Sequence, residues 1–388
     1  MHRQKRLAVV LASCQMLIII PLLFWLFRQT AVVYAADWNV NTFTDAADGD
    51  CDDGTCSLRD AVQLSAAFDT IFLPAGSYAL SSGLGEISLA KTITLTGQGA
   101  DATSTIIDGN NAIRLFNISS GTVTFSNLTL QNGAPASGNG GGILANGFSN
   151  VTLNDAILRD NVTVGNGGGI FLSGGILNIL NGSQVLSNTA TTSSNASGGG
   201  IYANQGTVNL TDSTVANNIA MRGGGIALNM ATATLNISNS QILSNEGQAP
   251  GPNSFPGGGI WNSSGSVIMN SGLISGNIAF RGAGALISAG TFTMNGGTIT
   301  NNEANYGGGF YVVNPAALLT INDGSIEANR SVATSFGGGA MYIFQGQAVQ
   351  NGGEIRENTA VNLGGAMEVR QGSFTMNGGS IASNSAGN

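Results

Sequence analysis

The chain has 388 residues, of which 58 are glycine, 13 are Lys or Arg and 21 are Asp or Glu. Glycine is about twice its usual share and charged residues make up only 9%, which excludes a charged disordered tail and disfavours long helical bundles. With only 7 prolines and no triplet glycine period, collagen is excluded as well, and a β-rich or repeat protein remains.

Residues 1–36 have the features of an export leader. Three basic residues precede an almost wholly apolar run over residues 7–27, and Val33-Tyr34-Ala35 then offers small residues at a cleavage point. The run is nearly long enough to span a bilayer, so an uncleaved N-terminal anchor is the alternative to a cleaved signal peptide. We expect a secreted, extracellular or cell-surface protein, the outer membrane included, which touches a membrane only if the leader is kept.

Removal of this leader alters the charge and the cysteine content. Nine basic residues then face 21 acidic ones, a formal charge of −12, and no basic stripe remains that could bind nucleic acid. The two cysteines left, Cys51 and Cys56, lie five apart in an exported chain. This context predicts a disulfide between them.

A glycine-rich signal that ends in a small or apolar residue recurs nine times, at intervals of 25 to 34 residues. The nine signals are Gly140–Ile143, Gly167–Ile170, Gly198–Ile201, Gly223–Ile226, Gly257–Ile260, Gly282–Ala285, Gly307–Phe310, Gly337–Ala340 and Gly364–Ala366. Short runs with a period of two follow each signal, which indicates strands. Repeats of this length without room for a crossover helix are typical of a parallel β-helix.

Small polar residues recur in step with the glycines. One set, at the end of the central run, is Asn154, Asn181, Thr211, Ser238, Asn270, Asn295, Asn322, Asn351 and Asn377. A second set closes each unit: Asn161, Asn188, Asn218, Asn245, Asn277, Asn302, Asn329, Asn358 and Asn384. We expect the amides of the second set to stack as an asparagine ladder, since asparagine also tolerates the backbone of sharp corners. The sequence therefore predicts an all-β, right-handed parallel β-helix, a pectin-lyase-like solenoid, over residues 71–388.

Residues 37–70 read as an N-terminal cap with a short helix. A serine is a good N-cap residue, and an acid three residues later approximates a capping box. We expect the helix to cover the open apolar end of the strand stack. The helix residues concerned are Ser57, Leu58, Asp60, Ala61 and Val62.

The segment from Cys51 to Val62, followed by the strand and turn at Ile71–Gly76, resembles the CSLREA-type N-terminal segment of exported bacterial right-handed β-helix proteins. It departs from that pattern at Asp60, where Glu is usual. The glycine signals, with Ile242-Leu-Ser-Asn245 and similar tetrapeptides, resemble the repeats of polymorphic outer-membrane proteins. The usual forms there are GGA-apolar and Phe-x-x-Asn. The two resemblances cover roughly residues 45–388 and imply a fold and an exported location rather than an activity.

Five aspartates crowd around Cys51, and Asp48-x-Asp50-x-Asp52 resembles a calcium loop. The loop glycine comes one place late, and Arg59 stands where a bidentate Glu would be needed. We expect a solvated acidic loop pinned by the disulfide, with calcium as the alternative, and we assign no metal or cofactor.

Glycoside hydrolysis would need two carboxylates a few ångströms apart. A lyase would need a basic catalyst near bound calcium, and Lys91 is the only lysine after the leader. Residues 140–388 hold ten acids, and no two of them share a stacked position in adjacent coils. Asp155 with Asp160, and Glu354 with Glu357, lie across corners of single coils. We therefore expect no catalytic residue in this region.

Two alignments between neighbouring coils are expected on the surface, one of three residues and one of two. Arg281, Tyr306 and Phe336 each precede a glycine signal in three successive coils. Stacked, they would form an aromatic and cationic strip, explained either by packing at a corner or by contact with a sugar or partner. Glu303 and Arg330 each follow a closing asparagine, which predicts an exposed ion pair of small energetic value.

These features favour a non-catalytic secreted or cell-surface scaffold, adhesive or protective, whose partners would be surface glycans or host or cell-envelope proteins. The alternative is a polysaccharide-binding or polysaccharide-cleaving β-helix protein. The last unit, Phe374 to Asn384, is not followed by a capping segment. An open sheet edge is a template for another chain, so we also expect end-to-end self-association.

Overall fold

The structure, a computed structural model, describes residues 35–191, 195–248 and 256–387. The expected leader, apart from its last two residues, lies outside this part of the chain. One compact unit begins at Ala36, and it is a nearly all-β parallel solenoid of about 11 turns with one short helix near its N-terminus. The solenoid predicted from the sequence is thus confirmed. Among the described residues, no helix is both long and apolar enough to cross a membrane.

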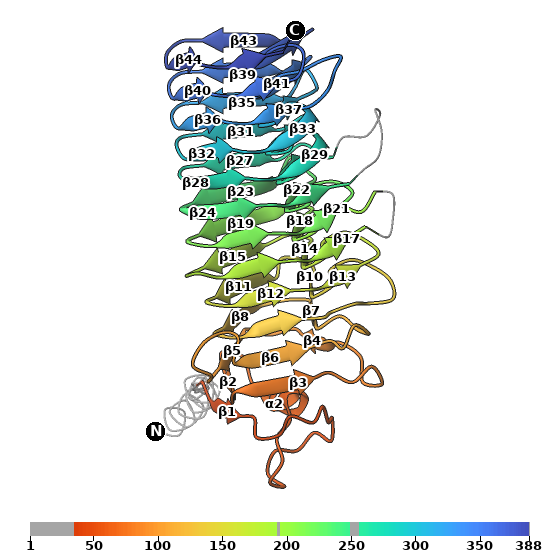
Figure 1. The fold of residues 1–388 in the computed structure, drawn as a ribbon. Coiled ribbons are helices and arrows are strands. Elements are labelled where there is room, and N and C mark those ends of the chain that lie inside the picture. The colour runs from red at the N-terminus through yellow and green to blue at the C-terminus, as the bar shows by residue number, and fades with distance from the viewer. Residues whose placement is uncertain (1–34, 192–194, 249–255, 388) are drawn as a thin grey trace, which may run out of the picture. The chain divides into compact units, whose positions relative to one another are not determined.

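Each turn of the central solenoid contains four short strands, stacked on those of the next turn (Figure 1). One turn consists of β14 (Ile170–Leu172), β15 (Ile176–Leu180), β16 (Gln184–Leu186) and β17 (Thr189–Ala190). Pairing between turns is parallel and in register, so that β16 pairs with the following strand β20 (Thr214–Ala216). Equivalent positions of the repeat therefore form columns along the stack.

The first and second sheets form two neighbouring faces of the solenoid and contain 13 and 12 strands. In stacking order, the first sheet comprises β1 (Asp37–Asn39), β2 (Thr70–Leu73), β5 (Ile93–Gly97), β8 (Thr122–Ser126), β11 (Asn150–Asn154), β15, β19 (Gly206–Thr211), β23 (Ala233–Ser238), β27 (Ser266–Met269), β31 (Thr291–Met294), β35 (Leu318–Ile321), β39 (Gln347–Gln350) and β43 (Ser373–Met376). The second comprises β3 (Gly76–Ala79), β6 (Thr105–Asp108), β9 (Thr129–Gln131), β12 (Ile157–Arg159), β16, β20, β24 (Ser240–Leu243), β28 (Gly272–Ser275), β32 (Thr298–Thr300), β36 (Ser325–Glu327), β40 (Glu354–Arg356) and β44 (Ser380–Ala382). The first strand, β1, lies within the segment assigned to the cap from the sequence.

The third and fourth sheets flank the glycine signals and contain 11 and 9 strands. The third comprises β4 (Ile87–Leu89), β7 (Phe116–Ile118), β10 (Ile143–Ala145), β14, β18 (Ile201–Ala203), β22 (Ile226–Leu228), β26 (Ile260–Asn262), β30 (Ala285–Ile287), β34 (Phe310–Val312), β38 (Met341–Phe344) and β42 (Met367–Arg370). The fourth comprises β13 (Val162–Thr163), β17, β21 (Ile219–Ala220), β25 (Glu246–Gly247), β29 (Ile278–Arg281), β33 (Glu303–Tyr306), β37 (Arg330–Ser331), β41 (Thr359–Ala360) and β45 (Ser385–Ala386).

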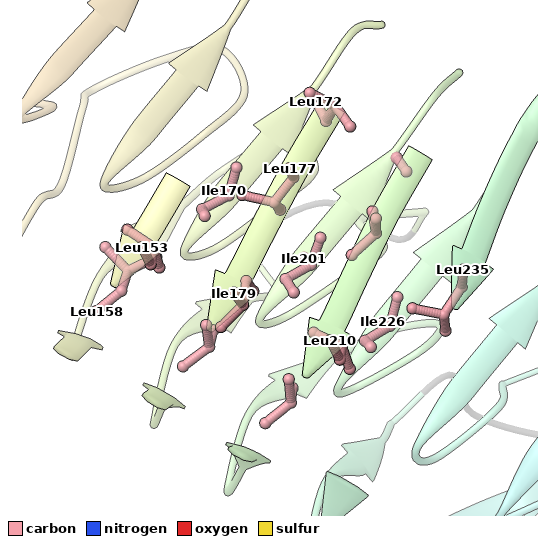
Figure 2. Close-up of a cluster of buried hydrophobic side chains, with 14 of the residues drawn as sticks. Leu153, Leu158, Ile170, Leu172, Leu177, Ile179, Ile201, Leu210, Ile226 and Leu235 are labelled. Carbon is pink, nitrogen blue, oxygen red and sulfur yellow. The ribbon is translucent and has the colours of Figure 1, made fainter. Parts of the chain in front are cut away.

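The interior of the stack is a continuous apolar core, mostly aliphatic, that also contains Phe116, Phe125, Phe292 and Phe310. Alternate residues of each strand point inward, as in β15, where Leu177 and Ile179 are fully buried. Figure 2 shows the labelled leucines and isoleucines of successive turns pointing into the space between the sheets. Because the same inward positions repeat in register, each side chain packs on its counterpart in the next turn, and the period of two in the sequence sets this core.

The helix α2 (Leu58–Leu64) lies against the first turn. Leu58, Ala61 and Val62 are buried in the same core cluster as Ile71 and Leu73 of β2. The helix thus contributes apolar side chains to the interior at the N-terminal end of the stack.

Candidate functional site

The nine closing asparagines form a column of hydrogen-bonded amides through the solenoid. Eight of them are fully buried, and Asn384 in the last turn is half-buried. The Nδ2 atom of each residue donates to Oδ1 of the next, at 2.9 to 3.0 Å in all eight steps. We refer to these nine residues as the buried ladder.

Each amide inside the ladder has its polar atoms satisfied. For Asn245, Oδ1 accepts from both the backbone N–H and Nδ2 of Asn218, at 3.0 Å each. Its Nδ2 atom donates to Val215 O and to Asn277 Oδ1, both at 3.0 Å. A buried polar group is tolerated when its hydrogen bonds are complete, which is the case here.

The residue before each ladder asparagine turns the chain through a left-handed conformation. All nine of these corner residues have φ between 50° and 65°. They are Asp160, Ser187, Asn217, Ser244, Gly276, Asn301, Ala328, Glu357 and Ser383. The backbone conformation at this corner is therefore the same in all nine turns, although the residue type differs.

The glycine signals and the buried ladder pack against each other. A Cβ added to Gly225 would lie 3.0 Å from Asn245 Cγ and 2.6 Å from Gly259 O. One added to Gly200 would lie 3.1 Å from Asn218 Cγ. The third glycine of the signal thus leaves the space that the buried amide fills, which explains why the two motifs recur together.

The N-terminal cap is built around Ser57, the N-cap residue of α2. Its Oγ accepts from the backbone N–H of Asp60, and the Asp60 carboxylate receives the backbone N–H of Gly49 at 2.9 Å. Ser57 Oγ also lies 2.7 Å from Asp60 Oδ2. Asp60, whose side chain is shorter than the usual Glu, thus binds the serine hydroxyl and the loop that precedes the helix. The predicted disulfide between Cys51 and Cys56 is present.

Aspartates of the acidic loop near Cys51 accept hydrogen bonds from backbone N–H groups of the same loop. Asp48 accepts from the N–H of Asp50, and Asp50 accepts from the N–H of Asp52. Hydrogen bonds from the backbone N–H and hydroxyl of Thr55 lower the pKa of Asp53. The described residues contain no group of three or more His, Cys, Asp or Glu arranged to hold a metal ion.

A largely buried ion pair ties this loop to the helix. Arg59 binds Asp45 with two hydrogen bonds, from Nε to Oδ1 at 2.9 Å and from Nη2 to Oδ2 at 3.0 Å. Arg59 stands where a calcium loop would need a bidentate Glu, and it pairs instead with a carboxylate of the same loop. Such bidentate pairs combine charge with fixed geometry, so we interpret this one as a structural clamp.

Arg281, Tyr306 and Phe336 lie together on the outside of the third sheet. Arg281 and Tyr306 are paired residues of β29 and β33, and the rings of Tyr306 and Phe336 are 6.4 Å apart. Phe336 comes from the loop after β37 rather than from a strand. We call these three residues and the column of apolar side chains beneath them the outer strip. The column residues are Tyr202, Ala227, Trp261, Leu286, Tyr311 and Tyr342.

The outer strip is a second hydrophobic cluster, separate from the interior core. Tyr311 and Tyr342 stack at 5.2 Å between ring centroids, and the guanidinium of Arg281 lies 5.4 Å from the Tyr311 ring. Burial raises the pKa of Tyr311 to about 12, against the opposing effect of Arg281. The column rings are buried, whereas Arg281, Tyr306 and Phe336 are half-buried and form the outer layer. The arrangement combines corner packing with an accessible aromatic and cationic edge.

Three of the four carboxylates considered for catalysis stand at corners, and the fourth, Glu354, is the first residue of strand β40. Asp155 and Asp160 have φ of 49° and 55°, and Glu357 has φ of 56°. Asn127, Asn181 and Asn239 occupy the position of Asp155 in other turns, also with positive φ. These acids therefore replace asparagine or serine at a corner.

One cluster of glutamates around an arginine was not predicted from the sequence. Arg356 forms ion pairs with Glu327, with Glu354 at 3.2 Å and with Glu357 at 2.9 Å. Glu327 is the register partner of Arg356, whereas Glu354 and Glu357 flank it along the chain. A search for acids at identical stacked positions does not detect this pattern, because the acids meet through a shared cation.

The predicted pair of Glu303 and Arg330 is present at 2.8 Å, with both side chains about half exposed. This confirms the alignment of these two turns. An exposed pair of this kind contributes little to stability.

Comparison with models of protein families, with curated proteins and with solved structures finds no match to this chain.

Proposed function

We propose that this protein is a non-catalytic, exported or cell-surface β-solenoid scaffold with an adhesive or protective role. The observation that carries the proposal is the placement of three of the four carboxylates considered for catalysis. Asp155, Asp160 and Glu357 adopt left-handed corner conformations that asparagine or serine adopts in other turns. Acids that serve as corner residues have a structural reason to be present, and a catalytic role is not needed to explain them.

The likeness to exported CSLREA-type β-helix proteins supports the same proposal. Its N-terminal segment corresponds here to the disulfide loop and to α2, which lies on the first turn. The glycine signals resemble those of polymorphic outer-membrane proteins. In this chain the third glycine of the signal packs against an asparagine of the buried ladder. Secretion or surface display, with surface glycans or envelope proteins as partners, and end-to-end self-association remain parts of this proposal.

The test is a search for product release from a panel of envelope and plant polysaccharides. The wild-type protein and a fourfold variant, Asp155→Asn, Asp160→Asn, Glu354→Gln and Glu357→Gln, are compared at equal folded concentration. We expect no release of reducing ends above a protein-free control from either protein. Release by the wild type that the variant loses, with the variant still folded, would establish a hydrolase or lyase instead.

Polysaccharide binding is a second candidate, favoured by the outer strip. Tyr306 and Phe336 expose parts of their rings in adjacent turns, and Arg370 lies 4.1 Å from the centroid of Phe336. Aromatic faces beside guanidinium groups suit the apolar faces and hydroxyls of sugars. Spacing by one turn would let successive sugar units meet successive rings.

This candidate is tested by affinity electrophoresis in gels that contain each polysaccharide. The double variant Tyr306→Ala and Phe336→Ala should lose at least about tenfold in affinity if the strip binds sugar. The matched control is Phe148→Ala, which removes an 86% exposed ring away from the strip. If the wild type, the double variant and the Phe148→Ala variant are retained equally in these gels, the outer strip does not bind sugar.

A further inference from the structure

A buried carboxylate, Asp69, collects three N–H donors at the start of the solenoid. Its Oδ1 atom accepts from the backbone N–H of Ala36 at 2.8 Å. Its Oδ2 atom accepts from Trp38 Nε1 at 2.8 Å and from the backbone N–H of Ala66 at 2.7 Å. Asp69 is only 2% exposed. It thus joins the first strand, β1, to the residues that follow α2.

The negative charge of Asp69 is only partly compensated by the groups around it. Burial raises the pKa of Asp69, but the three hydrogen bonds and the charge of Lys91 outweigh burial, and the net pKa is lowered. Lys91 itself donates to the carbonyl oxygen of Ser65. The three direct donors of Asp69 are therefore neutral groups, and a cation among them would strengthen the site because buried carboxylates are most stable when paired.

We propose that removal of the leader between Ala35 and Ala36 places a new α-ammonium group on Asp69 and thereby locks the first strand. An exported endopeptidase of the leader-removing class would hydrolyse the Ala35–Ala36 peptide bond with one water molecule. The bond's carbonyl carbon becomes the carboxylate of Ala35, and its nitrogen becomes the ammonium of Ala36. That nitrogen already lies at hydrogen-bonding distance from Asp69 Oδ1, so the ion pair needs no rearrangement.

The geometry selects this bond over the next one. Val33 and Ala35 supply the small residues that leader cleavage requires, and both Ala35 and Ala36 are exposed. Cleavage one residue later, at the boundary of the 1–36 segment expected from the sequence, would remove the donor to Asp69. It would also remove Ala36 O, which accepts from the N–H of Thr70 at 3.0 Å. The compact unit likewise begins at Ala36.

The first experiment identifies the N-terminal residue. The full chain is exported from a bacterial host, and its intact mass and N-terminal sequence are measured. The proposal requires Ala36. A protein that starts at Asp37, or that keeps its leader, overturns it.

The second experiment measures the ion pair. One glycine inserted between Ala35 and Ala36 lets the leader be removed but leaves an ordinary amide at Ala36. Hydrogen exchange of the Trp38 indole N–H, which donates to Asp69, reports on the site by NMR. Trp261 is the only other tryptophan after residue 36 and serves as the internal control.

The insertion should accelerate exchange at Trp38 by roughly tenfold, which corresponds to one unit of pKa coupling, and leave Trp261 unchanged. In an Asp69→Asn background the insertion should have no effect. Equal effects in both backgrounds, or none in the wild type, would overturn the pairing.

If Asp69→Asn does not accumulate, acetylation replaces it. Lys91 is the only lysine after residue 36, so in a Lys91→Arg variant the α-amino group is the single amine to modify. Acetylation must then accelerate exchange at Trp38 and not at Trp261. An acetylated protein with unchanged exchange at both tryptophans would contradict the proposal.

Discussion

Two columns of asparagine run along this solenoid with nearly the same hydrogen-bond lengths and with different surroundings. The amides of the first column donate to the next turn along the chain, and those of the second donate to the preceding turn. In the buried ladder the amides lie 2.9 to 3.0 Å apart inside the protein. In the second column, which we call the exposed ladder, each Nδ2–Oδ1 distance is 2.9 Å, but every side chain is exposed. The exposed ladder comprises Asn270, Asn295, Asn322, Asn351 and Asn377.

The comparison teaches that the length of a hydrogen bond does not measure its contribution to stability. Water replaces the partner of an exposed amide at little cost, whereas a buried amide that loses its partner keeps the full penalty of desolvation. We therefore expect the two ladders to differ strongly when they are interrupted. The following substitutions test that difference, from the largest expected effect to the smallest.

Asn245→Ala should be the most damaging. It removes the two acceptor contacts to Asn218 and the two donor contacts to Val215 and Asn277, all inside the core. Leaving such groups unsatisfied should lower the free energy of unfolding by about 3 to 5 kcal/mol. Chemical denaturation followed by circular dichroism measures the loss. A loss below about 1 kcal/mol would mean that water enters the site and that burial is not the deciding factor.

Gly225→Ala should also destabilise, through the space that the ladder needs. The new Cβ would lie 2.6 Å from Gly259 O, a backbone atom, and 3.0 Å from Asn245 Cγ. Overpacking of this kind costs about 1 to 3 kcal/mol. The matched control is Gly83→Ala, at an exposed glycine whose nearest neighbour would be Ser81 Oγ at 3.7 Å. If the two variants unfold at the same denaturant concentration, the glycine signal does not position the ladder.

Ala328→Gly should stabilise the protein. Ala328 is the exposed corner residue before Asn329 and has φ of 50°, where a side chain costs energy that glycine avoids. We expect a gain of about 0.5 to 1 kcal/mol, reduced by the larger entropy of the unfolded glycine chain. Ala145→Gly, in the buried strand β10, should show the opposite sign in the same assay. A loss of stability at both positions would indicate that the corner carries no strain.

The sequence predicted the solenoid because its signals are periodic. Runs with a period of two, stacked glycines and a recurring asparagine are local features, and in-register pairing turns each of them into a column. The paired positions of Arg281 and Tyr306, and of Glu303 and Arg330, followed from the same counting.

The features that the sequence did not predict involve side chains that contact residues of other columns or that lie outside the repeats. The spacing predicts Asn181 at the position of Asn154, but the register partner of Asn154 is Leu180. Asn181 is the left-handed corner residue that follows, and its Nδ2 atom still donates to Asn154 Oδ1 at 2.6 Å. The glutamates around Arg356 meet because a long guanidinium spans neighbouring positions, which spacing does not encode. Asp69 lies outside the repeats, so no periodicity marked it.

Asn295→Ala should have the smallest effect and completes the comparison. Asn295 donates to Asn270 Oδ1 and accepts from Asn322 Nδ2, both at 2.9 Å, within the exposed ladder. Because water can satisfy both neighbours after truncation, the free energy of unfolding should change by no more than about 0.5 kcal/mol. The measurement is made beside Asn245→Ala under the same conditions. A loss at Asn295 as large as that at Asn245 would show that the exposed ladder acts cooperatively along the stack, so that its amides stabilise one another as a continuous chain rather than as separate surface contacts.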